Sequence, residues 1–129
     1  MTQYVYLFVR QDLPIEHQII QTNHATYQLA VNYKPPETVP NIVLIGVPDK
    51  KGLERVLEKL RTYSIPHAKF VEPDYDFGLT AVCTAPLVGA ERIPLENYRP
   101  YRYPRSSEKE HQTFSLEDGG SIPSAGATL

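Results

Sequence analysis

Two short apolar runs do most to limit how this chain can fold. Residues 3–10 and 41–47 consist almost entirely of aromatic, β-branched and other aliphatic residues. Runs of this length and composition are typical of strands that are covered on both faces of a sheet. They fall far short of the roughly 18 consecutive apolar residues that cross a bilayer. We therefore expect a sheet that contains both segments, and no membrane-spanning segment.

The stretch between these two runs has the features of a helix. Asp12 and Pro14 supply a start signal, because proline fits the first turn of a helix. Three prolines between residues 35 and 40 end the pattern. The sequence predicts a helix over about residues 14–32. Its apolar residues recur at helical spacing, at Ile15, Ile19, Ile20, Tyr27 and Ala30.

The remaining elements complete an α/β pattern. Residues 50–63 place an apolar stripe opposite a charged face, as in an amphipathic helix that lies on a sheet. Residues 68–71 and 79–84 are predicted strands. The order strand, helix, strand, helix, strand, strand predicts a small α/β domain of two or three layers, with two main helices and a four-stranded mixed sheet. Ligands usually bind beyond the strand ends of such sheets, so residues 10–17 and 71–78 are the candidate loops.

Size and composition fit one domain in the cytoplasm. A chain of 129 residues can bury one real core. The N-terminus lacks the basic and hydrophobic regions of a secretion signal. The only cysteine, Cys83, excludes an internal disulfide, which agrees with a reducing compartment. Because Cys83 stands in an alternating apolar run, we expect it in the core.

The composition changes beyond Pro86. We predict a domain over residues 1–105, with a Pro-, Tyr- and Arg-rich extension from about residue 87. Residues 106–129 hold too little apolar surface to order themselves, which predicts a disordered tail. The net charge of −2 is unevenly distributed, since residues 1–105 carry 12 Lys and Arg against 11 Asp and Glu. Nucleic acid binding therefore stays open for the domain.

One polar stripe follows the first predicted helix. His17, Gln21, His24 and Gln28 fall within an arc of about 60° at 100° per residue. By itself this spacing is typical of the solvent-facing side of an amphipathic helix. A zinc site would need a third ligand and a closer histidine pair, so we predict neither a metal nor a cofactor. The roughly opposite face carries Ile15, Ile19, Thr26 and Ala30.

Two motifs give this helix a family resemblance. Residues 9–13 read Val-Arg-Gln-Asp-Leu, and residues 21–25 read Gln-Thr-Asn-His-Ala. This combination resembles the type II peptidyl-tRNA hydrolases, in which an R-x-D-L strand end leads to a helix bearing Q-x-x-H-A. The resemblance extends more loosely over residues 3–86. It implies the fold of that family and cleavage of the ester between a peptide and the 3′ end of tRNA.

The resemblance also implies roles for individual residues. His24 corresponds to the helix histidine, and a neutral imidazole can activate water or protonate a leaving hydroxyl. Asp74 is the candidate for the loop carboxylate, with Asp76 as its competitor. His17 stands where the family has a lysine, so a titratable group replaces a permanent cation, and Gln21 completes the catalytic candidates. Candidate substrate-binding residues are Arg10, Asp12, Asp76 and Thr80.

A second segment of interest is residues 97–105, which alternates tyrosine with arginine. Such a mixture can stack bases and hold phosphates. It can equally pack its tyrosines on the domain or on a second copy in a homodimer. The segment contains Tyr98, Tyr101 and Tyr103 with Arg99, Arg102 and Arg105.

Three functions remain open at this point. The first is an esterase that cleaves peptidyl- or aminoacyl-tRNA with a water activated by His24 and Asp74. The second is a non-catalytic module on the same fold that binds a small nucleotide or RNA. The third is an interaction protein recognised through its proline-rich C-terminal part.

Overall fold

Two parallel strands joined by a helix form the first half of the fold. The computed structural model describes residues 1–34 and 36–102, so the tail expected over residues 106–129 lies outside the described residues. Strand β1 (Tyr4–Arg10) leads into helix α1 (Ile15–Asn32), which returns the chain to β2 (Asn41–Val47). The register pairs Tyr4 with Asn41 and Arg10 with Val47, so β1 and β2 end at the same edge of the sheet.

The second half adds an antiparallel hairpin on the other side of β1. Helix α2 (Lys50–Thr62) precedes β3 (His67–Glu72) and β4 (Gly78–Thr84), and a 3-10 helix, η1 (Gly89–Leu95), follows them. The strand order is β2-β1-β4-β3, with β4 antiparallel to both of its neighbours. The predicted α/β class and four-stranded mixed sheet are therefore confirmed.

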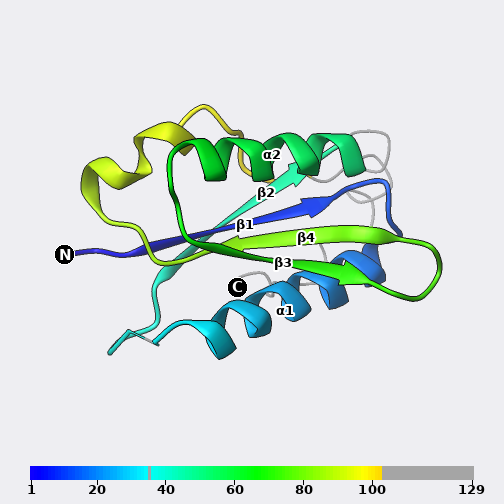
Figure 1. Ribbon diagram of the computed structural model, residues 1–129, viewed down its shortest axis with the longest axis horizontal. Helices are drawn as coiled ribbons and strands as arrows, with labels where there is room; N and C mark the ends of the chain where they lie inside the picture. Colours follow the sequence, from blue (N-terminus) through cyan, green and yellow to red (C-terminus); the bar gives the residue numbers. More distant parts are fainter. Residues whose placement is uncertain (35, 103–129) are drawn as a thin grey trace, which may run out of the picture.

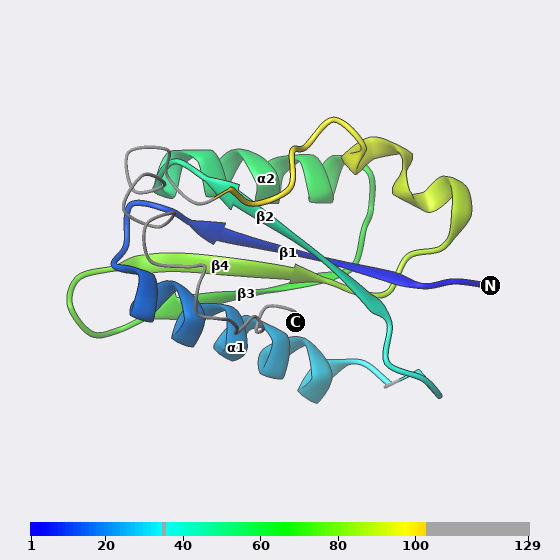
Figure 2. The ribbon, with the colours of Figure 1, turned by 180° about the vertical axis from the view of Figure 1, so that it is seen from behind.

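The helices cover both faces of this sheet. Figure 1 shows α2 on one side and α1 on the other, with η1 beside α2, and Figure 2 shows the same three layers from behind. Strand β1 supplies both cores because its side chains alternate. Tyr6 and Phe8 pack toward α2, whereas Val5, Leu7 and Val9 pack toward α1. Cys83 lies in the core on the α1 side and is fully buried, as expected.

Helix α1 turns a different face to the sheet from the one that its apolar residues indicate. Gln21 is only 1% exposed, whereas Ile19 is 58% and Tyr27 75% exposed. The expected solvent-facing position of the polar stripe is therefore wrong for Gln21. Hydrophobic spacing shows which residues share a face, but a buried amide is tolerated where hydrogen bonds offset its desolvation. The residues that α1 buries are Gln18, Gln21, Ala25 and Leu29.

Helix α2 follows its sequence pattern closely. Its buried residues are those of the predicted apolar stripe, Leu53, Val56, Leu57 and Leu60. Asp49 caps its start, since Oδ1 accepts a hydrogen bond from the Gly52 backbone N–H at 2.9 Å. Among residues 1–34 and 36–102, neither α1 nor α2 is apolar over enough of its length to span a bilayer.

The described part of the Tyr- and Arg-rich segment packs on its own domain. The Tyr98 ring meets Phe8 edge-on, with 5.1 Å between ring centroids. The Tyr101 hydroxyl donates to Gln18 Oε1 at 2.8 Å, and the Tyr101 backbone N–H donates to the Leu44 carbonyl at 2.7 Å. These two tyrosines thus connect the extension to the domain, while Tyr103 and Arg105 lie outside the described residues.

Candidate functional site

The residues singled out on α1 meet the hairpin formed by β3 and β4. Helix α1 packs against β3 and β4 as well as β1. Its polar stripe therefore faces β3, the edge strand next to β4. We call the resulting group the α1–β3 cluster. It consists of His17, Gln21 and His24 from the helix, Glu72 from the end of β3, and Thr80 from β4.

Gln21 is the centre of this cluster. The Thr80 hydroxyl, itself fully buried, donates to Gln21 Oε1 at 2.7 Å. On the other side, Gln21 Nε2 donates to Glu72 Oε1 at 2.8 Å. Both bonds involve the side-chain amide, so its orientation is fixed between one donor and one acceptor. Gln21 therefore links the core of the sheet to a carboxylate at the surface.

Glu72 is the carboxylate that faces the helix. Its second oxygen, Oε2, accepts a hydrogen bond from the Asp74 backbone N–H at 3.2 Å. The pKa of Glu72 is lowered, first by the Gln21 hydrogen bond, then by the Asp74 N–H, and further by the nearby His24 and His17. Glu72 is therefore ionised at neutral pH and places a negative charge beside both imidazoles.

The two histidines lie against aromatic rings. The His24 ring stacks on Phe70, with 4.4 Å between centroids and 19° between planes. His17 meets Tyr75 and Phe77 edge-on, at 5.1 and 5.2 Å. His24 is exposed and His17 half-buried. Stacking fixes the ring planes while leaving the polar edge of His24 open to a ligand.

The two loop carboxylates that were the predicted partners of His24, Asp74 and Asp76, lie in different surroundings from Glu72. Within the described chain, no hydrogen bond or ion pair joins His24 to Asp74 or Asp76. Asp74 takes part through its backbone, because its N–H binds Glu72 and its carbonyl accepts from the Phe77 N–H at 3.2 Å. Both Asp74 and Asp76 are exposed. The geometry brings Glu72, rather than either aspartate, to the helix.

A strained turn carries an aromatic ring to the cluster. Tyr75 and Asp76 both have positive φ, 61° and 58°, in the tight connection between β3 and β4. Two consecutive left-handed residues form the hairpin turn that matches strand twist, a position normally taken by Asn and Gly. A bulky residue in this region is uncommon and costs about 1 kcal/mol or more. The turn stacks Tyr75 on Phe77 and brings it against His17.

Arg10 and Asp12 form an internal link. Arg10 Nε and Nη2 donate to the two oxygens of Asp12, both at 2.9 Å. Arg10 Nη1 donates to the carbonyls of Phe77 and Leu79, which ties the end of β1 to the start of β4. The Arg10 side chain is only 11% exposed. Arg10, Asp12 and Thr80 thus bind other groups of the protein, and of the predicted binding residues Asp12 and Asp76 are exposed.

Glu72 is the site residue that the sequence reasoning missed. Strand alternation carries the signal, because Ala68 and Phe70 point toward α1 and Glu72 follows Phe70 by two residues. The predicted strand stopped at residue 71, which left Glu72 in a loop. A strand one residue longer would have placed its carboxylate against Gln21.

The groups gathered at the α1–β3 cluster suit proton transfer and stacking. In residues 1–34 and 36–102, no three His, Cys, Asp or Glu side chains gather in a way that could hold a metal. The α1–β3 cluster combines one carboxylate and two imidazoles, and the exposed Tyr75 ring contacts it at His17. Imidazole beside a carboxylate can transfer protons, and an exposed ring can stack on a planar group.

Comparison with known proteins supports the fold alone. No family model matches the chain, and no curated protein matches its sequence. A solved structure from Agrobacterium tumefaciens strain C58, described as Atu0240, a protein of unknown function, is similar with a TM-score of 0.60. The match has 9% sequence identity and covers 79% of this chain and 99% of the other. The chain therefore shares its fold with a protein that carries no assigned activity.

Proposed function

We propose that this chain is an esterase that cleaves the ester of peptidyl- or aminoacyl-tRNA, as the resemblance to type II peptidyl-tRNA hydrolases implies. One observation carries the proposal. Gln21 and His24, the two motif residues of α1, lie beside the ionised carboxylate of Glu72, and Gln21 binds that carboxylate directly. The residues of the sequence motif are therefore the residues of α1 that lie next to Glu72.

The chemistry needs one residue that contacts the reacting atoms and two that support it. His24 accepts a proton from a water molecule, whose oxygen attacks the ester carbonyl carbon. The tetrahedral intermediate collapses and the ribose hydroxyl leaves with the proton from His24. The other product is a carboxylic acid, which loses its proton to solvent. Glu72 stabilises the imidazolium that forms in between. Gln21 is a positioning residue, because it holds Glu72 against the helix.

The Tyr75 ring, which lies beside the α1–β3 cluster, fits the RNA part of such a substrate. Tyr75 is 69% exposed and is held in place by His17 and Phe77. A fixed, exposed ring is suited to stacking on the terminal base of an RNA end. His17 adds a positive charge for phosphate when it is protonated. Residues from the helix and the hairpin would therefore hold the two parts of one substrate.

The direct experiment measures release of the acyl group from N-acylated aminoacyl-tRNA. His24→Ala should lower the rate about 10²–10⁴-fold, the usual contribution of general acid–base catalysis. Asn23→Ala is the matched control, because Asn23 is the exposed neighbour whose side chain binds only the Ile19 carbonyl. An unchanged rate in His24→Ala would reject this mechanism.

A second function rests on the aromatic rings alone. The contacts among His17, Tyr75 and Phe77 would form a stacking surface for a small nucleotide or RNA even without turnover. Titration with tRNA and with mononucleotides separates the two functions. Binding that weakens in Tyr75→Ala, with no release of the acyl group, would favour the non-catalytic module.

A further inference from the structure

The outer face of α1 is unusually apolar for a surface helix. Five large apolar side chains are 42–75% exposed along its length. Charged side chains fill the exposed face of α2, whereas α1 contains one carboxylate, Glu16, and no Lys or Arg. A large exposed apolar area with few charges is typical of a protein interface. The five residues, which we call the α1 ridge, are Ile15, Ile19, Ile20, Tyr27 and Val31.

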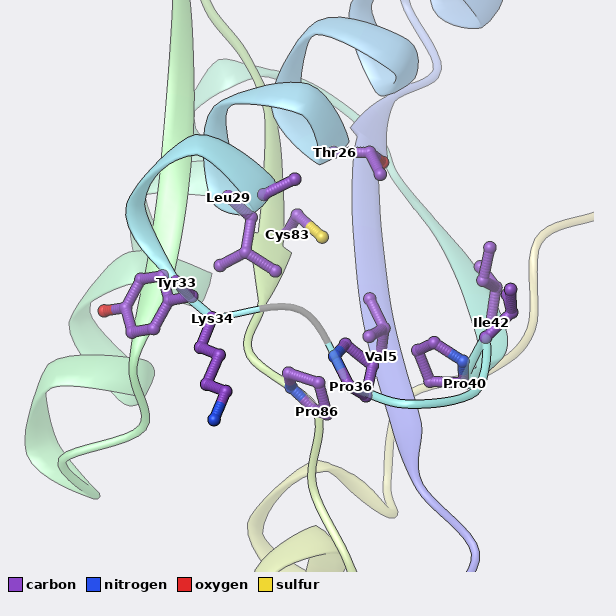
Figure 3. A pocket seen from close by; sticks show the side chains of 12 residues that line it. Val5, Thr26, Leu29, Tyr33, Lys34, Pro36, Pro40, Ile42, Cys83 and Pro86 are labelled. Carbon is purple, nitrogen blue, oxygen red and sulfur yellow. The ribbon is translucent and has the colours of Figure 1, made fainter.

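Two separate hollows lie between α1 and β2. Helix α1 packs on β1, β3 and β4, while Ile42 and Leu44 of the outer strand β2 remain 53% and 36% exposed. A hollow of about 130 Å³ borders Ile15, Ile19 and Leu44. A second, of about 170 Å³, lies at the other end of the helix beside Ile42 (Figure 3). The first hollow thus borders the α1 ridge at Ile15 and Ile19, and the second lies between the C-terminal part of α1 and β2.

The two ends of α1 carry opposite charges. Glu16 is exposed in its first turn, and Lys34 is exposed two residues beyond its end. Figure 3 shows the Lys34 side chain extending away from Cys83 and Leu29. Across the described part of the chain, neither Glu16 nor Lys34 forms an ion pair or a side-chain hydrogen bond. The helix rises by about 24 Å from Glu16 to its last residue, Asn32, and Lys34 follows the extended residue Tyr33.

We infer that a second copy of this chain covers the α1 face, with the two α1 helices antiparallel across a two-fold axis near residue 25. In this register Glu16 of each copy faces Lys34 of the other. Ile19 then faces Val31, and Asn23 faces Tyr27. Two-fold symmetry presents the same surface twice, so one complementary pair of charges is satisfied at both ends.

The charges decide the direction of packing and the kind of partner. A parallel arrangement would set Glu16 against Glu16 and Lys34 against Lys34, which is repulsive. The antiparallel arrangement pairs them, and it places Tyr27 near the centre, where aromatic residues contribute most to binding. Strand pairing through β2 is obstructed, because the Leu44 carbonyl already binds the Tyr101 N–H. Association would therefore depend on side chains.

Analytical ultracentrifugation of the full chain over a range of concentrations tests this interface. The molecular mass of the wild type from sedimentation should be about 29 kDa, twice the 14.6 kDa of one chain. Glu16→Lys and Lys34→Glu should each weaken the dimer at least tenfold, and the double variant should recover it. Glu54→Lys, on the exposed face of α2, is the control that should leave the dimer intact.

Three results would overturn the inference. The first is a monomer at every concentration, which would mean that something other than a second copy covers the face. The second is an unchanged dimer in both single variants. The third is a double variant as weak as the singles, which would reject the proposed register. Circular dichroism checks that each variant is folded. If Glu16→Lys unfolds the protein, the comparison of Lys34→Glu with wild type still tests the interface, because Lys34 lies outside the helix.

Discussion

A single buried amide connects the core of this protein to its candidate site. Gln21 has its oxygen bound by Thr80 and its nitrogen bound to Glu72, and it is 1% exposed. Such a residue serves the fold and the site together. Removing its amide leaves the Thr80 hydroxyl with only the Phe70 carbonyl at 3.3 Å and leaves Glu72 with only the Asp74 N–H, so its effects reach both stability and chemistry.

We predict that Gln21→Leu lowers the free energy of unfolding by about 1–3 kcal/mol, because Thr80 then loses its acceptor at 2.7 Å and keeps only the longer contact with the Phe70 carbonyl at 3.3 Å. Urea unfolding measures this change. Gln28→Leu makes the same substitution at an exposed position of α1 and should stay within about 0.5 kcal/mol of wild type. Equal effects in the two variants would show that the Gln21 hydrogen bonds do not stabilise the fold.

The lowered pKa of Glu72 predicts a pH dependence with a definite sign. A carboxyl whose pKa is lower in the folded state stabilises it above the unfolded pKa, and that stabilisation is lost as the pH falls through the folded pKa. Wild type should therefore lose stability relative to Glu72→Gln on acidification below about pH 4. Thermal melts of both proteins from pH 7 to pH 3 measure the difference, and parallel curves would contradict it.

At the scale of elements, the two helices differ in how much their sequences reveal. Charged residues on one side and leucines on the other fix the orientation of α2, and its buried stripe was predicted correctly. In α1 the apolar residues spread around the helix and two glutamines are buried, so its orientation depends on hydrogen bonds formed only in the folded protein. The hydrogen bond from Gln21 also holds Glu72 against the helix, and the predicted strand missed Glu72 because it ended at residue 71.

The turn of the β3–β4 hairpin should trade stability for the position of Tyr75. Asp76→Gly removes a positive-φ side chain and should raise the free energy of unfolding by up to about 1 kcal/mol while keeping the Tyr75 ring in place. Tyr75→Asn also suits the turn but loses the contacts with His17 and Phe77. Thermal melts and RNA titrations of the two variants separate these effects. If Asp76→Gly destabilises the protein, the turn is not strained.

At the scale of the whole molecule, one cysteine reports on the integrity of the α1 layer. Cys83 is fully buried beneath α1, and burial raises its pKa to about 11. Only about one thiol in a thousand is then ionised at pH 8, and reaction requires the thiolate. A thiol reagent should label the folded protein far more slowly than the unfolded one, at a rate that rises with urea. Rapid labelling without urea would mean that α1 opens readily.

In the proposed ester hydrolysis, Glu72 supports His24 by stabilising its imidazolium. The most direct measurement of this role is the rate of acyl release from N-acylated aminoacyl-tRNA by wild type, Glu72→Gln and Asp74→Asn under one set of conditions. We predict a loss of at least about tenfold in Glu72→Gln, because the imidazolium loses its carboxylate, and little change in Asp74→Asn, whose backbone N–H remains. The reverse order, or no release by wild type above the His24→Ala background, would contradict the account.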